Sequence, residues 1–272
     1  VFPVIGGFVG GDTVAGLLST GLGAQDAAAL MIDIGTNGEI ALARDGELRA
    51  ASTAAGPAFE GARISCGMRA TRGAIEKAVL DDDLHVSVIG NAPPIGLCGS
   101  ALVDLAAGLL DAGILSPEGV LRTGDDLPAG LGEGLRRRIR VADNGQPEFV
   151  LAAGDEAPNP VALTQRDVRE LQLSVGAIRA GTALLLQQAG LKGADLRRVL
   201  IAGGFGSFIR RSHAQRIGLL PPDVPHSRIQ CVGNAALGGV RWALLSTDAR
   251  EQAEALARGA RHVDLSQDPA FQ

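Results

Sequence analysis

Apolar and polar positions follow two periods along the chain, and the first third shows both. Between residues 11 and 22 an apolar stripe of Val14, Leu17 and Leu18 predicts a helix, with Asp12 or Thr13 as its cap. A continuous apolar run at 29–34 predicts a buried strand. Residues 39–43 and 47–53 return as strands after short turns, so an antiparallel three-stranded meander is expected.

The rest of the chain alternates between helical and extended patterns. In the middle of the chain we predict a loop and helix over 54–79, a strand at 84–90, a helix at about 100–112, and a loop-rich stretch over 116–160 with a hairpin at Asn144-Gly145. A long helix at 165–189 follows, which the capping-box-like TQRD opens and Gly190 ends. We then predict a strand and glycine loop at 198–207, a glycine turn, an Asn234 cap and a helix over 231–246, a helix at 249–258 and a short strand at 262–265. A meander followed by this alternation predicts an α/β domain with a mixed sheet.

Composition excludes several classes of protein. The 272 residues are 46% hydrophobic and only 3% aromatic, so a folded core of Ala, Val, Leu and Ile is expected. A net charge of −5 argues against a nucleic-acid partner, and we interpret the basic run at 136–140 as a solvated face. Neither a membrane-spanning run nor the basic start of a signal peptide is found, and the beginning looks cut from a longer chain or processed.

Cysteine and histidine spacing gives no local metal motif. Cys66, Cys98 and Cys231 lie far apart, and the four histidines form no ligand pair, so neither a zinc site nor an iron–sulfur site is expected from spacing. The odd cysteine count predicts a reducing, cytoplasmic compartment. Cys98 precedes a helix start, which can activate a thiol, but we interpret it as a buried small residue.

The stretch MIDIGTNGEI, residues 31–40, carries the clearest chemistry. Asp33 ends a buried strand, and Gly35, Thr36, Asn37 and Gly38 follow as a turn that can present backbone N–H groups to an anion. An ionised aspartate there suits a hydrated Mg²⁺ beside phosphates, with Glu39 as a second carboxylate. The alternative is an ordinary hairpin in which Asp33 caps its own turn.

Two further glycine-rich stretches follow. In LIAGGFGSFI, residues 200–209, a buried strand ends in Gly203, Gly204, Phe205 and Gly206, which suits a flat ligand lying on bare backbone. Close packing of strand and helix would explain the same glycines. Gly238 and Gly239 lie inside a predicted helix, where each costs about 1 kcal/mol relative to Ala, so a second helix is expected to pack closely there.

The order of these elements resembles the second half of the actin, sugar kinase and heat-shock chaperone ATPase superfamily. The longer stretches DIGTNGEI, STAAGPAFEGARISCGMRA, TQRDVRELQLSVGAIRAG, IAGGFGSFI and RIGLLP are similar to the C-terminal domain of reductive activators of corrinoid-dependent enzymes, and the similarity runs over nearly the whole chain. The resemblance implies a single ATPase-type domain over 1–272. It would be a ribonuclease-H-like half of that fold, with an inserted loop and hairpin subdomain at about 54–160.

The same resemblance implies a nucleotide site. Asp33 would be the catalytic carboxylate and would orient Mg²⁺ or its waters, the backbone of residues 35–38 would hold the β- and γ-phosphates of ATP, and Glu39 would be a further cofactor-binding carboxylate. Residues 203–206 would border the adenosine, and Asp12 and Asn234 would serve as hinge or cap. Glu60 stands where the chaperone ATPases approach the base, although a first-turn helix acid favoured by the dipole explains it equally well.

The activity implied by the resemblance is ATP-driven reduction of Co(II) to Co(I) in a corrinoid protein. That partner would be a corrinoid iron–sulfur protein or the corrinoid subunit of a methyltransferase. The electron would come from a [2Fe–2S] cluster in a separate N-terminal domain, which this chain lacks together with the first phosphate hairpin. A docking or dimerisation scaffold without turnover, and a small-molecule kinase of the same superfamily, remain the alternatives, and a homodimer stays open.

Overall fold

The computed structural model describes residues 1–23, 27–204 and 206–268, which divide into two compact units. The first unit comprises Val1–Ala55, Gly176–Arg211 and Gly218–Gln272, and the second comprises Gly56–Val175 and Ser212–Ile217. Apart from its first two residues, the segment at about 54–160 falls in the second unit.

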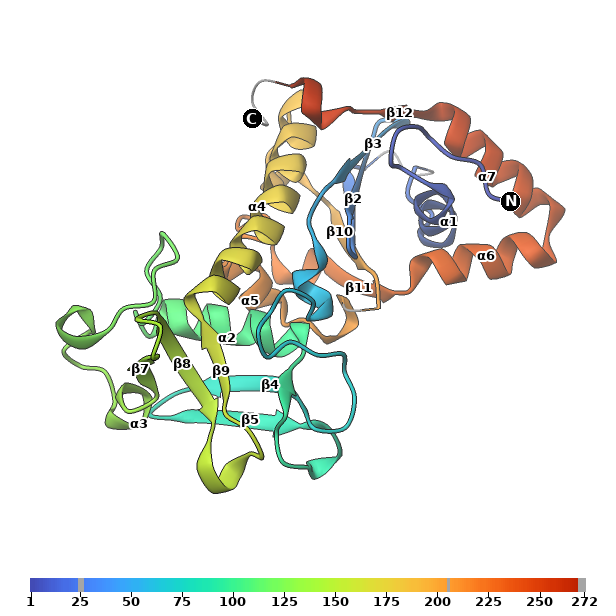
Figure 1. The fold of residues 1–272 in the computed structure, drawn as a ribbon. Coiled ribbons are helices and arrows are strands. Elements are labelled where there is room, and N and C mark those ends of the chain that lie inside the picture. The colour runs from blue at the N-terminus through green and yellow to red at the C-terminus, as the bar shows by residue number, and fades with distance from the viewer. Residues whose placement is uncertain (24–26, 205, 269–272) are drawn as a thin grey trace. The chain divides into compact units, whose positions relative to one another are not determined.

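A six-stranded mixed sheet forms the centre of the first unit (Figure 1). Its strands are β1 (Ala29–Ile34), β2 (Gly38–Arg44), β3 (Glu47–Thr53), β10 (Arg198–Ala202), β11 (Ile229–Gly233) and β12 (Ala260–His262), in the order β11-β10-β1-β2-β3-β12. The first three strands are antiparallel, whereas β10 pairs with β1 and β12 with β3 in parallel. The meander and the mixed sheet are therefore confirmed, and the last strand begins two residues before its predicted start.

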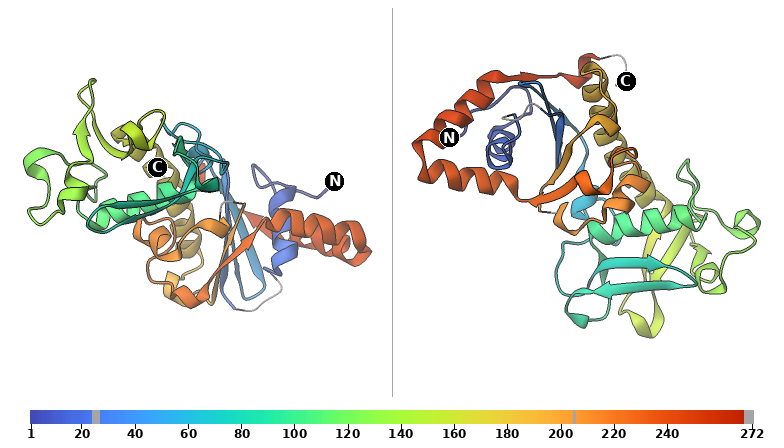
Figure 2. Two further views of the ribbon diagram at one scale, coloured as in Figure 1. Left: turned by 90° about the horizontal axis from the view of Figure 1, so that it is seen from below. Right: turned by 180° about the vertical axis from the view of Figure 1, so that it is seen from behind.

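Helices cover both faces of this sheet (Figures 1 and 2). On one face lie α1 (Gly11–Thr20), α6 (Ala235–Leu245) and α7 (Thr247–Gly259), and on the other the C-terminal part of α4 (Gln165–Gln188). Leu17 of α1 packs with Met31 and Leu200 in one apolar cluster. Because side chains alternate along a strand, Asp33 faces the same side as Met31.

Helices α1 and α6 approach each other at a glycine. A Cβ added at Gly239 would lie 1.9 Å from the carbonyl oxygen of Ala15, so no larger residue fits without separating the two helices. The Ser19 hydroxyl donates a hydrogen bond to the Ala235 carbonyl at 2.7 Å across the same contact. The close helix contact expected at this glycine pair is confirmed.

The caps of these two helices differ. Asn234 caps α6 as predicted, since its side chain accepts the N–H of Leu237 at 2.9 Å. The N-cap of α1 is Gly10, and no side chain caps that end, so the prediction of Asp12 or Thr13 as the cap is wrong. In the described part of the chain, the Asp12 carboxylate accepts the N–H of its neighbour Thr13 at 2.8 Å and lies inside the first turn.

The second unit is built from two small sheets and helix α2 (Gly99–Asp111), which packs on β4. The sheets are β5-β4-β6, from Ala74–Leu80 (β4), Leu84–Val88 (β5) and Gly96–Leu97 (β6), and β7-β8-β9, from Ile139–Val141 (β7), Pro147–Ala152 (β8) and Val161–Thr164 (β9). The short helices are α3 (Glu133–Arg136) and α5 (Arg211–Arg216). The hairpin predicted at Asn144-Gly145 joins β7 to β8.

Helix α4 opens with the predicted capping box. The Asp167 carboxylate accepts the Thr164 N–H at 2.9 Å, and the Thr164 hydroxyl accepts the Asp167 N–H at 3.2 Å. Asp167 is fully buried and also accepts the N–H and hydroxyl of Ser65. This carboxylate therefore ties the start of α4 to the loop around Ser65.

The predicted helix over 59–79 does not form. A single 3₁₀ turn at Pro57–Glu60 leads into an irregular loop, and the chain becomes regular again only as strand β4. Gly61 has φ +81°, which ends the turn, and a Cβ added at Gly67 would lie 2.0 Å from the Gly61 carbonyl oxygen. The backbone crosses itself here, so a continuous helix is excluded and Glu60 opens none.

The basic run at 136–140 is only partly solvated. Arg137 and Arg138 both donate to Asp83, at 2.6 and 2.5 Å, but the Arg138 side chain is mostly buried while that of Arg137 is exposed. Within the described part of the chain, no helix combines the length and apolarity that a membrane crossing requires.

Candidate functional site

Asp33 and Glu39 face each other across the β1–β2 ladder, next to the turn at 35–37. The antiparallel register pairs Asp33 with Glu39 and Ile34 with Gly38. Directly opposite side chains in such a pair lie on one face of the sheet, where two like charges repel each other. The turn therefore holds two carboxylates on the face covered by α1.

The first turn of α1 adds a third carboxylate. Burial, and after it the nearby charge of Asp12, raise the pKa of Asp33 from 3.8 to about 6. The pKa of Glu39 rises from 4.5 to about 7, first through burial and then through Asp12 and Asp33. The three groups therefore form one electrostatic cluster, although Asp12 is remote from the turn in sequence.

Little in the protein compensates this cluster. The Ser52 hydroxyl donates to Glu39 over a long 3.4 Å, and Asp12 accepts the Thr13 N–H. Among the described residues, no hydrogen bond or ion pair reaches the Asp33 carboxylate. A partly buried carboxylate without a partner is unfavourable, and a bound cation would relieve that cost.

The glycine loop after β10 lies against this carboxylate. Gly203 has φ +95°, and a Cβ added there would lie 2.6 Å from the Ile34 carbonyl oxygen and 3.0 Å from Oδ1 of Asp33. The Gly203 N–H donates to the Gly233 carbonyl at 2.9 Å, which fixes the loop to the end of β11. The structure thus brings together the two motifs that the sequence predicted as one site.

The predicted glycines serve different purposes. A Cβ at Gly206 would lie 2.7 Å from Ile201, and one at Gly38 would lie 2.7 Å from Ile178 of α4, so these two permit close packing. A Cβ at Gly204 would meet nothing within 4 Å, which leaves its exposed backbone open to a ligand. Phe205 lies outside the described residues.

The turn at 35–37 offers polar groups at the surface. Thr36 and Asn37 are exposed, and the Gly35 N–H donates to the Asn37 carbonyl at 3.1 Å within the turn. That N–H is therefore engaged, and the Thr36 hydroxyl and the Asn37 amide supply the polar side chains of the turn.

The donor set fits a hydrated Mg²⁺. Carboxylate oxygens are the ligands that Mg²⁺ prefers, and this ion keeps several of its waters when it binds. No set of three or more His, Cys, Asp or Glu side chains in the described residues is arranged to hold a metal directly. Asp12, Asp33 and Glu39 thus suit a cation held partly through water.

The remaining candidate residues lie in the second unit. Glu60 is exposed at the end of the 3₁₀ turn, and its contact with a nucleotide base stays a prediction. Cys98 is buried at the start of α2, which confirms its interpretation as a buried small residue. Burial, and then the charge of Asp167, raise the pKa of the Cys66 thiol to about 12, so it stays protonated.

Asp12 is the site residue whose role the sequence analysis missed. It was interpreted as a hinge or cap because it opens a helix, yet it caps nothing and acts electrostatically on Asp33 and Glu39. No local pattern indicates this role, because the charge of Asp12 comes near Asp33 only through the packing of α1 on the sheet.

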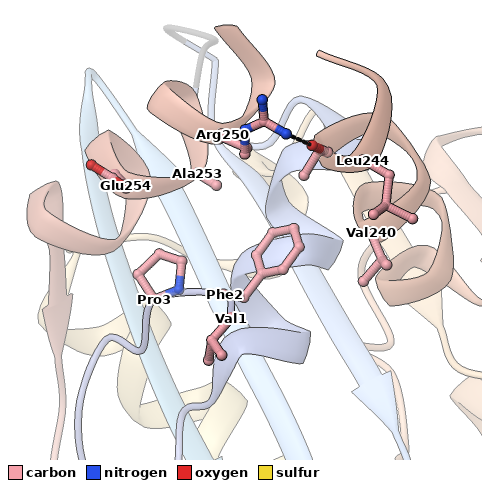
Figure 3. Close-up of a pocket in the computed structure, with 9 residues that line it drawn as sticks. Val1, Phe2, Pro3, Val240, Leu244, Arg250, Ala253 and Glu254 are labelled. Carbon is pink, nitrogen blue, oxygen red and sulfur yellow. Dashed lines mark hydrogen bonds between the residues drawn. The ribbon is translucent and has the colours of Figure 1, made fainter. Parts of the chain in front are cut away.

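An apolar groove lies elsewhere in the first unit (Figure 3). It encloses about 360 Å³ and is lined by residues 1–3 together with Val240 and Leu244 of α6 and Ala253 of α7. Arg250 donates to the Ala243 carbonyl at 3.0 Å at its edge. None of the carboxylates around the 35–37 turn lines it, so the groove is separate from the candidate site.

Comparison with known proteins gives consistent matches. The family described as the C-terminal domain of RACo, the ASKHA domain, matches residues 27–272. The corrinoid activation enzyme RamQ of Eubacterium limosum is 42% identical over 99% of this chain and 45% of its own length. A [Co(II) methylated amine-specific corrinoid protein] reductase of Methanosarcina barkeri is 29% identical over 99% of this chain and 49% of its own.

A solved structure agrees with these matches. The reductive activator for corrinoid, iron–sulfur protein superposes with a TM-score of 0.87 at 38% identity, over 99% of this chain and 42% of that one. The chain thus spans about half the length of the curated relatives it matches.

Proposed function

This chain belongs to the family of C-terminal ASKHA domains of RACo, and from that membership we propose that it binds and hydrolyses MgATP within a reductive activator of a corrinoid protein. Its fold is that of the actin, sugar kinase and chaperone ATPase superfamily. One observation carries the proposal: Asp33 stands partly buried and without a partner among the described residues, between a polar turn and an open glycine loop.

The charges of the site support a nucleotide with its cation. Three carboxylates repel one another, and also the phosphates of ATP, until a divalent cation joins them. Bound Mg²⁺ would supply charge neutralisation at the β- and γ-phosphates. Asp33 and Glu39 would hold its waters, and the polar side chains of Thr36 and Asn37 would contact phosphate oxygens.

Proton transfer falls to the same carboxylates. A general base must lie within reach of the water that it deprotonates, and Glu39 lies directly opposite Asp33 in the β1–β2 register. We assign Glu39 as the acceptor of the proton from the attacking water, with Asp12 orienting that water from the first turn of α1. Gly203 and Gly204 would border the adenosine, while Phe205, Gly206 and Glu60 remain proposed nucleotide contacts.

The names of the relatives support the corrinoid partner. One relative is a corrinoid activation enzyme, another a corrinoid protein reductase, and the solved one an activator for a corrinoid, iron–sulfur protein. Reduction of Co(II) to Co(I) is thermodynamically unfavourable with ordinary electron donors. ATP would therefore drive a conformational change that alters how the activator binds the corrinoid protein. The electron would come from a [2Fe–2S] centre in another domain.

A docking role without turnover is the second candidate, and the surface of α6 favours it. Large apolar side chains are exposed along this helix: Leu237, Val240, Trp242, Leu244 and Leu245. Exposed apolar residues grouped on one helix commonly mark a protein interface. Nucleotide binding without turnover would support this reading over the first.

Calorimetric titration of MgATP tests the proposal. We expect saturable binding to the wild type and at least a hundredfold weaker binding to Asp33→Asn. Asp45→Asn is the matched control, because Asp45 is exposed in the next turn of the meander and its positive φ suits asparagine. Binding that survives in Asp33→Asn would overturn the assignment of the site.

Measuring the release of phosphate distinguishes an ATPase from a small-molecule kinase. Release of phosphate from MgATP without any added acceptor supports an ATPase, whereas a strict requirement for a small-molecule acceptor would indicate a kinase. We expect release without an acceptor, and at least a tenfold lower rate in Glu39→Gln.

A further inference from the structure

Helix α2 buries a carboxylate in the middle of an otherwise apolar sequence. Asp104 is only 3% exposed, and Asp111 is the other charged residue of the helix. The two lie seven residues apart, so they share one face of the helix two turns from each other. The residues that we propose for Mg²⁺ and the phosphates include neither of them.

Helix α5 supplies a partner to each of these carboxylates. The ring Nδ1–H of His213 donates to Oδ1 of Asp104 at 2.7 Å, and Nε of Arg216 donates to Asp111 at 2.5 Å. The Ala78 N–H of β4 donates to the other oxygen of Asp104 at 3.3 Å. The acidic spacing on α2 therefore matches the basic spacing on α5.

The fold alone does not require a buried pair of this kind. An apolar side chain of similar volume often packs at least as stably, because two charged or polar groups lose their hydration on burial. The pair adds geometric specificity, because a hydrogen bond to a carboxylate forms only within a narrow range of distances and angles. His213 and Asp104 thus hold α5 in one orientation on α2.

The position of α5 in the chain gives that orientation a consequence. The glycine loop at 203–206 ends in a 3₁₀ turn at Gly206–Phe208, and α5 begins only three residues later. Residues up to Arg211 and from Gly218 belong to the first unit, whereas Ser212–Ile217 belong to the second. The segment that follows the glycine loop is therefore anchored in the second unit.

We propose that the Asp104–His213 pair positions the glycine loop and couples its occupancy to the second unit. With α5 fixed on α2, the short connection from Gly206 to Arg211 restricts the loop. A ligand that reorders the loop then shifts α5, and with it α2 and β4. The coupling half of this inference rests on the proposed nucleotide binding, whereas the positioning half does not.

Hydrogen exchange in the nucleotide-free protein tests the positioning half. His213→Ala should speed exchange in peptides spanning 198–211 about tenfold, and His213→Gln, which keeps a donor, should restore part of the protection. The control is His85→Ala, which removes an exposed histidine 3.1 Å from Asp81 in the same unit. Unchanged loop exchange in a folded His213→Ala protein would overturn the inference.

A second variant covers the case in which His213→Ala does not fold, because it leaves the buried Asp104 without its histidine donor. Asp104→Leu with His213→Ala removes the carboxylate as well and keeps the volume filled. Faster loop exchange in this folded double variant supports positioning by the pair. Wild-type exchange in the loop would show that apolar packing of α5 suffices, and would end the proposal.

Saturating MgATP tests the coupling half. In the wild type, we expect MgATP binding to slow hydrogen exchange in α2 and β4. His213→Ala should bind MgATP about tenfold more weakly, and at saturation its α2 and β4 should exchange as fast as without nucleotide. Protection of α2 that persists in His213→Ala would overturn the coupling. If the wild type binds no MgATP, the proposed function fails, while the exchange of the nucleotide-free protein still decides whether the pair positions the loop.

Discussion

Two buried aspartates in this protein stand in opposite circumstances. Asp167 is fully buried in the second unit and accepts hydrogen bonds from the backbone N–H and hydroxyl groups of both Ser65 and Thr164. Asp33, in the first unit, is partly buried, and in the described part of the chain no donor reaches its carboxylate. The first is satisfied by the fold, whereas the second is not, and we propose that a ligand compensates it.

The difference shows how to distinguish a structural carboxylate from a functional one. Burial alone does not, because both side chains are removed from water. The hydrogen-bond partners do distinguish them. A buried charge that serves the fold is surrounded by donors of the protein, whereas at a binding site the ligand or its cation supplies the partners. Each prediction below changes one side of this comparison.

The largest effect is expected at the satisfied carboxylate. Asp167→Asn places an amide where four donors converge, and we expect a loss of about 4 kcal/mol in the free energy of unfolding. Chemical denaturation followed by circular dichroism measures it. A loss below about 1 kcal/mol would show that the network around Ser65 and Thr164 contributes little, and the contrast with Asp33 would disappear.

The opposite sign is expected at the unsatisfied site. At pH 8, Asp33→Asn combined with Glu39→Gln should raise the free energy of unfolding by about 3 kcal/mol, which is roughly half of the sum that the two pKa shifts give, because solvent screens these partly exposed groups. The nucleotide-free protein is compared, with Asp45→Asn as the matched control. A destabilised double variant would contradict the assignment of these carboxylates to a ligand.

The same pair predicts a pH dependence of known sign. Both pKa values are raised on folding, so the native state holds these protons more tightly than the unfolded chain does. Their contribution to stability is therefore complete below about pH 4 and is lost as the pH rises through 6 and 7. The wild type should lose stability relative to the double variant between pH 5 and 8, and equal pH profiles would refute this.

Substitutions at Gly203 and Gly204 distinguish a residue that supports the shape of the site from one that contacts the ligand. Gly203→Ala should cost about 2 kcal/mol, because φ is +95° and the added methyl would meet the Ile34 carbonyl and Asp33. Thermal unfolding of the variant measures it. An unchanged midpoint would mean that the loop relaxes away from β1 freely.

The smallest effect is expected at the neighbouring position. Gly204→Ala adds a methyl into open space, so stability should stay within about 0.5 kcal/mol of the wild type while MgATP binding weakens about tenfold. Calorimetry and thermal unfolding on the same sample separate the two readouts. Full affinity in this variant would place the nucleotide away from the backbone of Gly204.

Local sequence was sufficient where one element decides the outcome. The strand at 29–34, the turn after Asp33, the long helix with its capping box and the Asn234 cap all follow from spacing that spans a few residues. The sequence also predicted the glycine contact between α1 and α6, because paired glycines inside a helix have a cost that close packing explains. Asp33, Glu39 and the 203–206 loop, in contrast, were named as one site from the resemblance to the activator family.

Only the tertiary structure decided what lies between elements. The stretch at 59–79 has helix-compatible residues but is held as an irregular loop, because Gly61 and Gly67 meet backbone to backbone and Asp167 anchors Ser65. Asp12 joins Asp33 only once α1 packs on the sheet, and Asp104 meets His213 only once α5 packs on α2. The periodicity of apolar residues along the chain shows which face of a helix or strand is buried. The pKa of a carboxylate depends instead on the charges and the water that surround it in the folded protein. The sequence by itself therefore determined most elements of the first unit and the candidate motifs, and packing decided which carboxylates find donors in the fold and which do not.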